Sequence, residues 1–392
     1  MREVVITSAQ RTPIGDFLGA LSDISAVELG VIALKAALAK TQLAVSQIEE
    51  VVAGNVFQAG LKGNPARQVA LKAGCSLETV AVTINQLCPS SMRATEILAQ
   101  EIALGKVDIG AAVGMESMSN VPYLLPKARS GYRMGNAEML DSMLNDGLFD
   151  AFYDYHMGLT AENLAEMYKV SREEQDELAF LSHQRAIAAM QQGKFTDEIV
   201  PVEVKTKKGT VVVSTDEHPN SATSLESLKK LKPVFKKDGT VTAGNASGLN
   251  DGGSALILMA SEKAAELGIK PLAKICSTAS AAVDPKIMGI GVVPAVMKAL
   301  KFAQLQREDI DYWELNEAFA AQFLAVNREL KLNMDKVNAN GSGISLGHPV
   351  GDTGIRLIVT LLHELQRRGA RYGCASLCAG GGPAAATIVE LL

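Results

Sequence analysis

Short apolar runs alternate with longer amphipathic segments over the first 120 residues. Apolar, β-branched runs are typical of strands buried in a sheet, and they occur at 3–6, 51–56, 80–84 and 108–113. Segments with apolar residues at helical spacing lie between them, at 26–38, 65–72 and 88–104. This β-α alternation predicts a mainly parallel sheet with helices on both faces.

The alternation stops near residue 120 and resumes near residue 250. Residues 120–158 are rich in Gly, Met, Tyr and Asn and show no clear period. An irregular insertion of this length is usually functional. Beyond it, Ser171 and Glu174 form a capping box that opens a predicted helix at 171–192, and residues 197–213 predict a hairpin.

A second β-α series begins near residue 271. Strands are expected at 273–277, 312–315, 373–377 and 384–390, and helices at 293–302, 317–330 and 352–368. The stretch NQLCPSSMRA from Asn85 can be superimposed on NEAFAAQFLA from Asn316. This superposition, with the matching β-α order, predicts two duplicated halves.

Composition narrows the class of protein. The chain has 392 residues, a net charge of −5 and only 5% aromatic residues, which argues against nucleic-acid binding. Five cysteines without a CxxC motif suit a reducing cytoplasm, and the absence of a signal peptide or a long apolar run leads us to expect no membrane association. Residues 201–240 hold eight Lys and no Arg against five acidic residues. This tract is either a solvated surface or an attraction for a phosphorylated ligand.

Cys88 is the first candidate for chemistry, because it lies where a predicted buried strand at 80–84 leads into a helix. Unpaired N–H groups and the helix dipole at such a position favour the thiolate, which is the nucleophilic form. The alternative is a small buried residue without a catalytic role.

Three glycine-rich turns carry further polar residues: NEAFA at 316–320, GSGISLGHPVGDTG at 341–354 and CAGGG at 378–382. His348 either holds its turn through a carbonyl or takes the proton from Cys88. Cys378 is either a small strand residue or a second acid/base thiol beside backbone N–H groups that could hold an oxyanion.

In these motifs the whole chain resembles the thiolase family. NxxC at 85–88, NEAFA, GHPVG at 347–351 and CAGGG follow one another in the family's order and spacing. The resemblance implies the α/β thiolase fold, with two similar β-α halves in five layers, α-β-α-β-α, and an inserted loop domain. The expected domains are an N-terminal half at 1–119 and 250–270, a loop domain at 120–249 that binds CoA and mediates oligomerisation, and a C-terminal half at 271–392.

The resemblance also implies roles for single residues. Cys88 would hold the acetyl group as a thioester, His348 would activate Cys88, and Cys378 would remove the α-proton of a second acetyl-CoA. Asn316 would hold a water that faces the enolate oxygen together with His348. The N–H groups of Cys88 and Gly380 would form the second oxyanion hole.

The expected CoA and acyl contacts follow from the family's short-chain branch, which YHMG at 155–158 and IMG at 287–289 resemble. By resemblance, His156 and Ser247 would contact the pantetheine, and Met157 and Met288 would line the acyl pocket. Apolar contacts would come from Leu148, Phe235, Ala243, Leu249, Ala318 and Phe319. No metal and no cofactor other than the CoA thioesters is expected.

The implied activity is acetyl-CoA C-acetyltransferase: two acetyl-CoA give acetoacetyl-CoA and CoA, reversibly, in a homo-oligomer that is expected to be a tetramer. One alternative is a thiolase for longer or branched 3-ketoacyl-CoA, and another is a non-catalytic CoA-binding scaffold. Pro89 and Ser91 replace two glycines usual in the family, so the shape of the acyl pocket is in question. Asn220 replaces an arginine near the CoA nucleotide.

Overall fold

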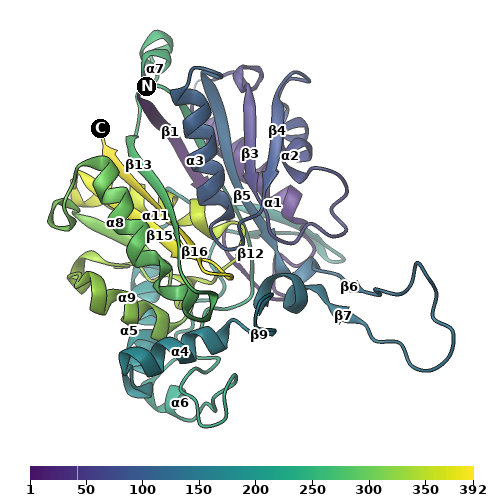
Figure 1. Ribbon diagram of the computed structural model, residues 1–392. Coiled ribbons are helices and arrows are strands. Elements are labelled where there is room, and N and C mark those ends of the chain that lie inside the picture. The colour runs from purple at the N-terminus through teal and green to yellow at the C-terminus, as the bar shows by residue number, and fades with distance from the viewer. Residues whose placement is uncertain (42) are drawn as a thin grey trace.

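A ten-stranded mixed sheet forms the centre of the computed structural model, which describes residues 1–41 and 43–392 (Figure 1). The strand order is β14-β15-β16-β13-β1-β12-β5-β3-β4, and β2 pairs with β12. The strands are β1 (Val4–Arg11), β2 (Gly15–Asp16), β3 (Glu50–Gly54), β4 (Val80–Ile84), β5 (Ile109–Ser117), β12 (Asn250–Ala260), β13 (Ala273–Ala282), β14 (Tyr312–Leu315), β15 (Tyr372–Cys378) and β16 (Pro383–Leu391).

The sheet consists of two similar halves that meet at β1 and β13, where only Val5–Lys274 and Ile6–Ala273 are paired. Beyond β1 the order is β12-β5-β3, and beyond β13 it is β16-β15-β14. The last two strands of each series, β5 with β3 and β15 with β14, run parallel. The expected duplication is therefore present in the fold.

The sequence superposition that suggested the duplication is in the wrong register. By strand order, β14 corresponds to β3, so Asn316 after β14 corresponds to Asn55 after β3 and not to Asn85 after β4. The error has a simple cause: an apolar strand followed by Asn occurs at the ends of both β3 and β4.

The expectation of a mainly parallel sheet is also wrong. Among the described strands, β3 with β4, β3 with β5 and β14 with β15 are parallel, whereas the pairs formed by β1, β12, β13 and β16 are antiparallel. Between β15 and β16 a tight turn replaces a crossover helix. Gly381 and Gly382 make this turn possible, because their φ angles of 77° and 98° are open to glycine.

Helices complete the five layers, as expected. They are α1 (Ala26–Ala39), α2 (Pro65–Ala73), α3 (Ser90–Ala103), α7 (Ser261–Leu267), α8 (Val292–Ala303), α9 (Ala320–Leu330), α10 (Gly343–Leu346) and α11 (Thr353–Arg368). Helices α3 and α11 share one buried cluster with strands of both halves, so they form the middle layer. Helices α1 and α2 cover the outer face of the first half, and α8 and α9 cover that of the second.

The two central helices cross with their backbones in contact. A Cβ atom at Gly354 of α11 would lie 2.5 Å from the Met92 nitrogen of α3. This close crossing places the loop before α3, which carries Cys88, beside the loop before α11, which carries His348.

Residues between β5 and β12 lie outside the large sheet and form small elements around one end of it (Figure 1). These are β6 (Tyr123–Leu124), β7 (Leu140–Asp141), β8 (Phe149–Asp150), β9 (Tyr155–His156), α4 (Gly158–Tyr168), α5 (Arg172–Gln191), β10 (Val202–Thr206), β11 (Gly209–Val213) and α6 (Leu225–Lys229). The predicted capping box at Ser171 and the predicted β10–β11 hairpin are both present. The β6–β7 hairpin extends far from the body (Figure 1).

Strand β4 has the predicted bounds. It was expected to be buried, but it is not. It lies at the edge of the sheet, where Val80 is 64% exposed and Val82 is 38% exposed. An apolar run therefore does not distinguish a central strand from an edge strand whose side chains are uncovered. Across residues 1–41 and 43–392, the helices are too short or too polar to cross a membrane.

Candidate active site

Cys88 occupies a strained turn between β4 and α3. The preceding residue, Leu87, has a φ of 55°, which is rarely adopted by a side chain of this size. Two hydrogen bonds hold the turn: Asn85 Oδ1 accepts from the Leu87 N–H at 2.9 Å, and the Ser90 N–H donates to the Leu87 carbonyl at 2.9 Å. Such local strain is found where a functional side chain is held in place.

The Cys88 thiol is protonated near neutral pH, contrary to the expectation of a thiolate. Burial raises its pKa to about 11, although N–H groups of Gly380 and of Cys88 itself lower it in part. Helix α3 begins at Ser90, so Cys88 precedes the first helical turn. Desolvation outweighs the local dipoles here, and the thiol needs a base before it can act as a nucleophile.

His348 is a neutral base that lines the same cavity as this thiol. Its ring is buried, and burial together with the nearby Arg356 lowers its pKa to about 3. Its Nε2 lies 3.4 Å from Asn316 Nδ2, and its Nδ1 lies 2.6 Å from Thr353 Oγ1. The main chain is fixed as well, since the His348 N–H donates to Asn250 Oδ1 at 2.9 Å.

One apolar cavity of about 350 Å³ brings together Cys88, His348 and Gly380. All ten residues expected to contact CoA or the acyl group line it: Leu148, His156, Met157, Phe235, Ala243, Ser247, Leu249, Met288, Ala318 and Phe319. The His156 ring stacks on Phe235 with centroids 4.5 Å apart, and burial lowers the His156 pKa to about 4. The cavity can therefore hold a slender, largely apolar ligand that reaches Cys88.

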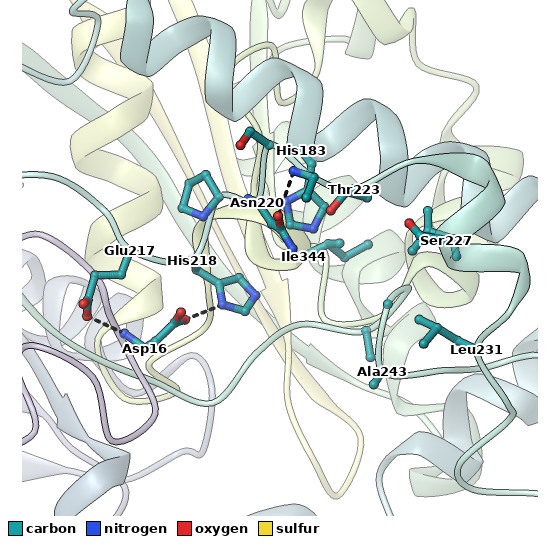
Figure 2. Close-up of a pocket in the computed structure, with 16 residues that line it drawn as sticks. Asp16, His183, Glu217, His218, Asn220, Thr223, Ser227, Leu231, Ala243 and Ile344 are labelled. Carbon is teal, nitrogen blue, oxygen red and sulfur yellow. Dashed lines mark hydrogen bonds and ion pairs between the residues drawn. The ribbon is translucent and has the colours of Figure 1, made fainter.

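A second cavity, of about 690 Å³, adjoins the first and shares Ala243 and Ala246 with it. Figure 2 shows its wall, where His218 pairs with Asp16 and the Asn220 N–H donates to His183. Within the described chain, none of the eight lysines at 201–240 lines either cavity. The walls of these two cavities therefore carry no positive charge from the lysine tract.

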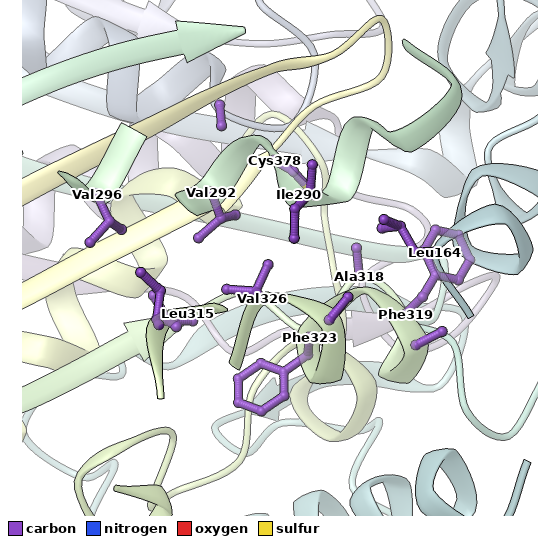
Figure 3. Close-up of a cluster of buried hydrophobic side chains, with 14 of the residues drawn as sticks. Leu164, Ile290, Val292, Val296, Leu315, Ala318, Phe319, Phe323, Val326 and Cys378 are labelled. Atoms are coloured by element: carbon purple, nitrogen blue, oxygen red, sulfur yellow. The ribbon is translucent and has the colours of Figure 1, made fainter. Parts of the chain in front are cut away.

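Two of the expected catalytic residues lie behind the cavity wall. Cys378 ends β15 and is 1% exposed, in a cluster with Ile290, Val292 and Ala318 (Figure 3). Burial raises its pKa, and the neighbouring Cys88 raises it further. Asn316 is equally buried and does not line the cavity, but it contacts His348, which does.

The side chains of Pro89 and Ser91, which replace two glycines usual in the family, lie outside the cavity lining. Ser91 points away from it: its Oγ donates to the Asp352 carbonyl at 2.9 Å and accepts from the Ile355 N–H at 3.0 Å. Neither Pro89 nor Ser91 lines the cavity, so neither side chain narrows it by direct contact. Instead, Ser91 adds a link between α3 and α11.

Sequence reasoning missed three polar residues that hold the site. Asn250 and Thr353 bond to His348, and buried Glu116 accepts from the Val56, Phe57 and Gly351 N–H groups beside the cavity. Thr353 lies inside the quoted histidine turn, but nothing in a single sequence shows that its hydroxyl faces the ring. Within residues 1–41 and 43–392, no group of His, Cys, Asp or Glu side chains is arranged to hold a metal ion.

Comparisons with known proteins identify the family of the whole chain. The family "Thiolase, N-terminal domain" matches residues 4–262, and "Thiolase, C-terminal domain" matches residues 269–391. An acetyl-CoA acetyltransferase of Pseudomonas aeruginosa is 52% identical over 97% of this chain and 98% of its own length. The acetyl-CoA acetyltransferase of Escherichia coli is 50% identical over the full length of both chains.

Solved structures match equally well. An acetyl-CoA acetyltransferase from Syntrophomonas wolfei covers all of both chains with a TM-score of 0.98 and 49% identity. Human mitochondrial 3-ketoacyl-CoA thiolase covers 100% of this chain and 99% of its own, with a TM-score of 0.97 and 44% identity. With the two family matches spanning nearly its whole length, this chain belongs to the thiolase family.

Proposed function

We propose that this chain is an acetyl-CoA C-acetyltransferase, which joins two acetyl-CoA molecules to acetoacetyl-CoA and CoA and catalyses the reverse cleavage. The observation that carries the proposal is the convergence of two thiols and a neutral imidazole at one apolar cavity: Cys88 and His348 line it, and Cys378 lies directly behind. Bacterial relatives about half identical over their full length are acetyl-CoA acetyltransferases.

The first half-reaction transfers the acetyl group to the enzyme. His348 Nε2 takes the Cys88 proton, and the thiolate sulfur forms a bond to the acetyl carbonyl carbon. The N–H groups of Cys88 and Gly380, which already lie near this sulfur, stabilise the tetrahedral oxyanion. When it collapses, the bond to the CoA sulfur breaks, and CoA leaves with the proton of Cys378, which becomes a thiolate, while His348 keeps the Cys88 proton.

The second half-reaction forms the carbon–carbon bond. Cys378, as a thiolate, removes an α-proton from a second acetyl-CoA, and a water held by Asn316 together with His348 stabilises the enolate oxygen. The enolate carbon attacks the acetyl group on Cys88, and the bond from that carbon to the Cys88 sulfur breaks. The released Cys88 sulfur takes its proton back from His348, and Cys378 keeps the α-proton, so both thiols and the neutral imidazole are restored. The reaction uses side chains and CoA thioesters and needs no metal or resident cofactor.

CoA and its thioesters are the proposed ligands of both cavities. The smaller cavity suits the pantetheine arm, because Ser247 and His156 supply polar groups among apolar walls. The larger cavity, joined to it through Ala243 and Ala246, suits the nucleotide end of CoA. Asn220 lies there and can contact the nucleotide through hydrogen bonds but not through charge.

The second candidate is a thiolase for longer 3-ketoacyl-CoA. It is favoured by the 44% identity to human mitochondrial 3-ketoacyl-CoA thiolase. Met157 and Met288 both line the small cavity and are 6% and 3% exposed, which limits the length of the acyl chain beside Cys88.

One assay separates the candidates. Cleavage of acetoacetyl-CoA should be at least tenfold more efficient, as kcat/KM, than cleavage of 3-ketohexanoyl-CoA. Equal or greater efficiency with the six-carbon substrate would favour the second candidate. The Met288→Ala variant is the matched test of the pocket, because it should raise kcat/KM for 3-ketohexanoyl-CoA more than for acetoacetyl-CoA.

We also propose a homotetramer in the cytoplasm. The β6–β7 hairpin projects from the body and exposes apolar side chains, among them Tyr123 at 61% and Met134 at 99%. Exposed apolar surface on a projecting hairpin is typical of an interface between subunits. The reaction requires reduced thiols at Cys88 and Cys378, which suits a reducing compartment.

A further inference from the structure

Thr353 and Asn316 contact different nitrogens of the His348 ring, Thr353 at Nδ1 and Asn316 at Nε2. Thr353 Oγ1 is 2.6 Å from His348 Nδ1 and 2.9 Å from the Pro349 carbonyl oxygen. Both side chains are buried, with Thr353 0% exposed and His348 5% exposed, so water does not compete for these contacts.

The number of protons available at this contact determines which ring nitrogen of His348 is protonated. A hydroxyl has one proton, and the Pro349 carbonyl can only accept a hydrogen bond. When the hydroxyl donates to Pro349, its oxygen is left as an acceptor, and the contact at Nδ1 requires a proton on that nitrogen. The other ring nitrogen, Nε2, then carries the lone pair.

The surroundings of Nε2 agree with this tautomer. Asn316 directs Nδ2, a donor, toward Nε2 at 3.4 Å. On the proposed function, Nε2 faces the cavity and must accept the Cys88 proton, for which it needs a lone pair. The pKa of Cys88 is raised to about 11, so without this base little thiolate forms near neutral pH.

We propose that Thr353 is a positioning residue that holds His348 in the Nδ1–H tautomer and thereby makes Nε2 available as the base for Cys88. The same hydrogen bond stabilises the imidazolium formed when Nε2 takes the proton, because Nδ1–H donates more strongly from a charged ring. We take the size of the effect from the partners that orient metal-bound histidines, whose removal typically costs about 10- to 100-fold in activity.

The test follows the hydroxyl separately from the methyl group. Thr353→Ser keeps the hydroxyl, Thr353→Val keeps the shape, and Thr353→Ala keeps neither. For each variant, the rate of Cys88 alkylation by iodoacetamide is measured in the free enzyme by mass spectrometry, and kcat and KM are measured for acetoacetyl-CoA cleavage. Thr95→Val is the matched control, because that buried hydroxyl donates only to Ser91 within α3 at 3.0 Å.

We expect the Val and Ala variants to lose about 10- to 100-fold in both alkylation rate and kcat, with KM within about twofold, and the Ser variant and the control to match the wild type. If Val fails to fold, Ser against Ala decides the same question. If Thr353→Val keeps the wild-type rates and Thr353→Ser loses them, the methyl group and not the hydroxyl matters, and the proposal is overturned. Alkylation that is unchanged or faster without the hydroxyl also overturns it, because the hydroxyl would then have donated to Nδ1 and favoured the Nε2–H form. Alkylation needs no substrate, so these outcomes stand apart from a failure of the proposed activity.

Discussion

Cys88 and His348 meet as neutral groups, and burial is the reason. It raises the pKa of the thiol to about 11 and lowers the pKa of the imidazole to about 3. Burial therefore disfavours the charged form of each group, and with it a resting thiolate–imidazolium pair. The proton must move during the attack on the substrate, which makes the orientation of His348 as important as its presence.

This leads to a pH prediction at the level of the residue. Because the Cys88 pKa lies above the usual thiol value, the fraction of thiolate keeps rising with pH beyond neutrality. In His348→Ala, which lacks the base that takes the Cys88 proton, we expect the rate of Cys88 alkylation by iodoacetamide to rise without a plateau between about pH 7 and pH 10. Peptide mass spectrometry after timed quenching measures it. A plateau already reached near pH 7 would mean a stabilised thiolate.

The two thiols should be separable by substitution. Cys378→Ser should still be acetylated at Cys88 by acetyl-CoA but should fail to condense, because a hydroxyl is a far weaker base than a thiolate. His348→Ala should lose both steps. One acetylation assay and one condensation assay on each variant measure this. A correctly folded Cys378→Ser that is not acetylated would show that the two cysteines act as one unit.

At the level of elements, the crossing of α3 and α11 sets the distance between nucleophile and base. Each helix follows a loop that carries one of the two groups, and the helices belong to different halves of the fold. Their backbones touch at Gly354 and Met92, and Ser91 adds two hydrogen bonds across the same point.

Gly354→Ala should therefore affect stability and activity together. The new Cβ would lie 2.5 Å from the Met92 backbone nitrogen, and backbone cannot give way as a side chain does. We expect a loss of about 1–3 kcal/mol in stability and a slower acetylation of Cys88. Urea denaturation and a rapid-quench acetylation assay measure the two effects. Gly63→Ala, where a Cβ meets nothing within 4 Å, is the control and should match the wild type.

Periodicity predicted the elements themselves closely, since β4 and β14 have the expected bounds and α11 differs by one residue at its start. It did not predict that β4 lies at an edge or that β16 returns antiparallel, because an apolar run is the same in either setting. The prediction that Cys88 favours the thiolate was wrong for a related reason, because the residues that bury its thiol are distant in sequence. Thr353 and Asn250 were missed because their contacts exist only in the folded turn.

At the scale of the molecule, the exposed apolar side chains of the β6–β7 hairpin predict that copies of this chain associate. Deleting residues 126–137 should convert the expected tetramer into a smaller assembly, because this removes the tip of the β6–β7 hairpin, on which the proposed interface rests. Light scattering coupled to size exclusion measures the mass. Acetylation of Cys88 serves as the control for folding and should be retained. A wild-type monomer at micromolar concentration would contradict the prediction.

The central claim is that Cys88 carries the acetyl group. Intact-mass spectrometry of the enzyme mixed with acetyl-CoA, followed by peptide mapping, tests it most directly. We predict one acetyl group on Cys88, and for Cys88→Ala no acetylation and no thiolysis or condensation. An acetyl group on Cys378 or Cys276, or activity that survives in Cys88→Ala, would contradict it.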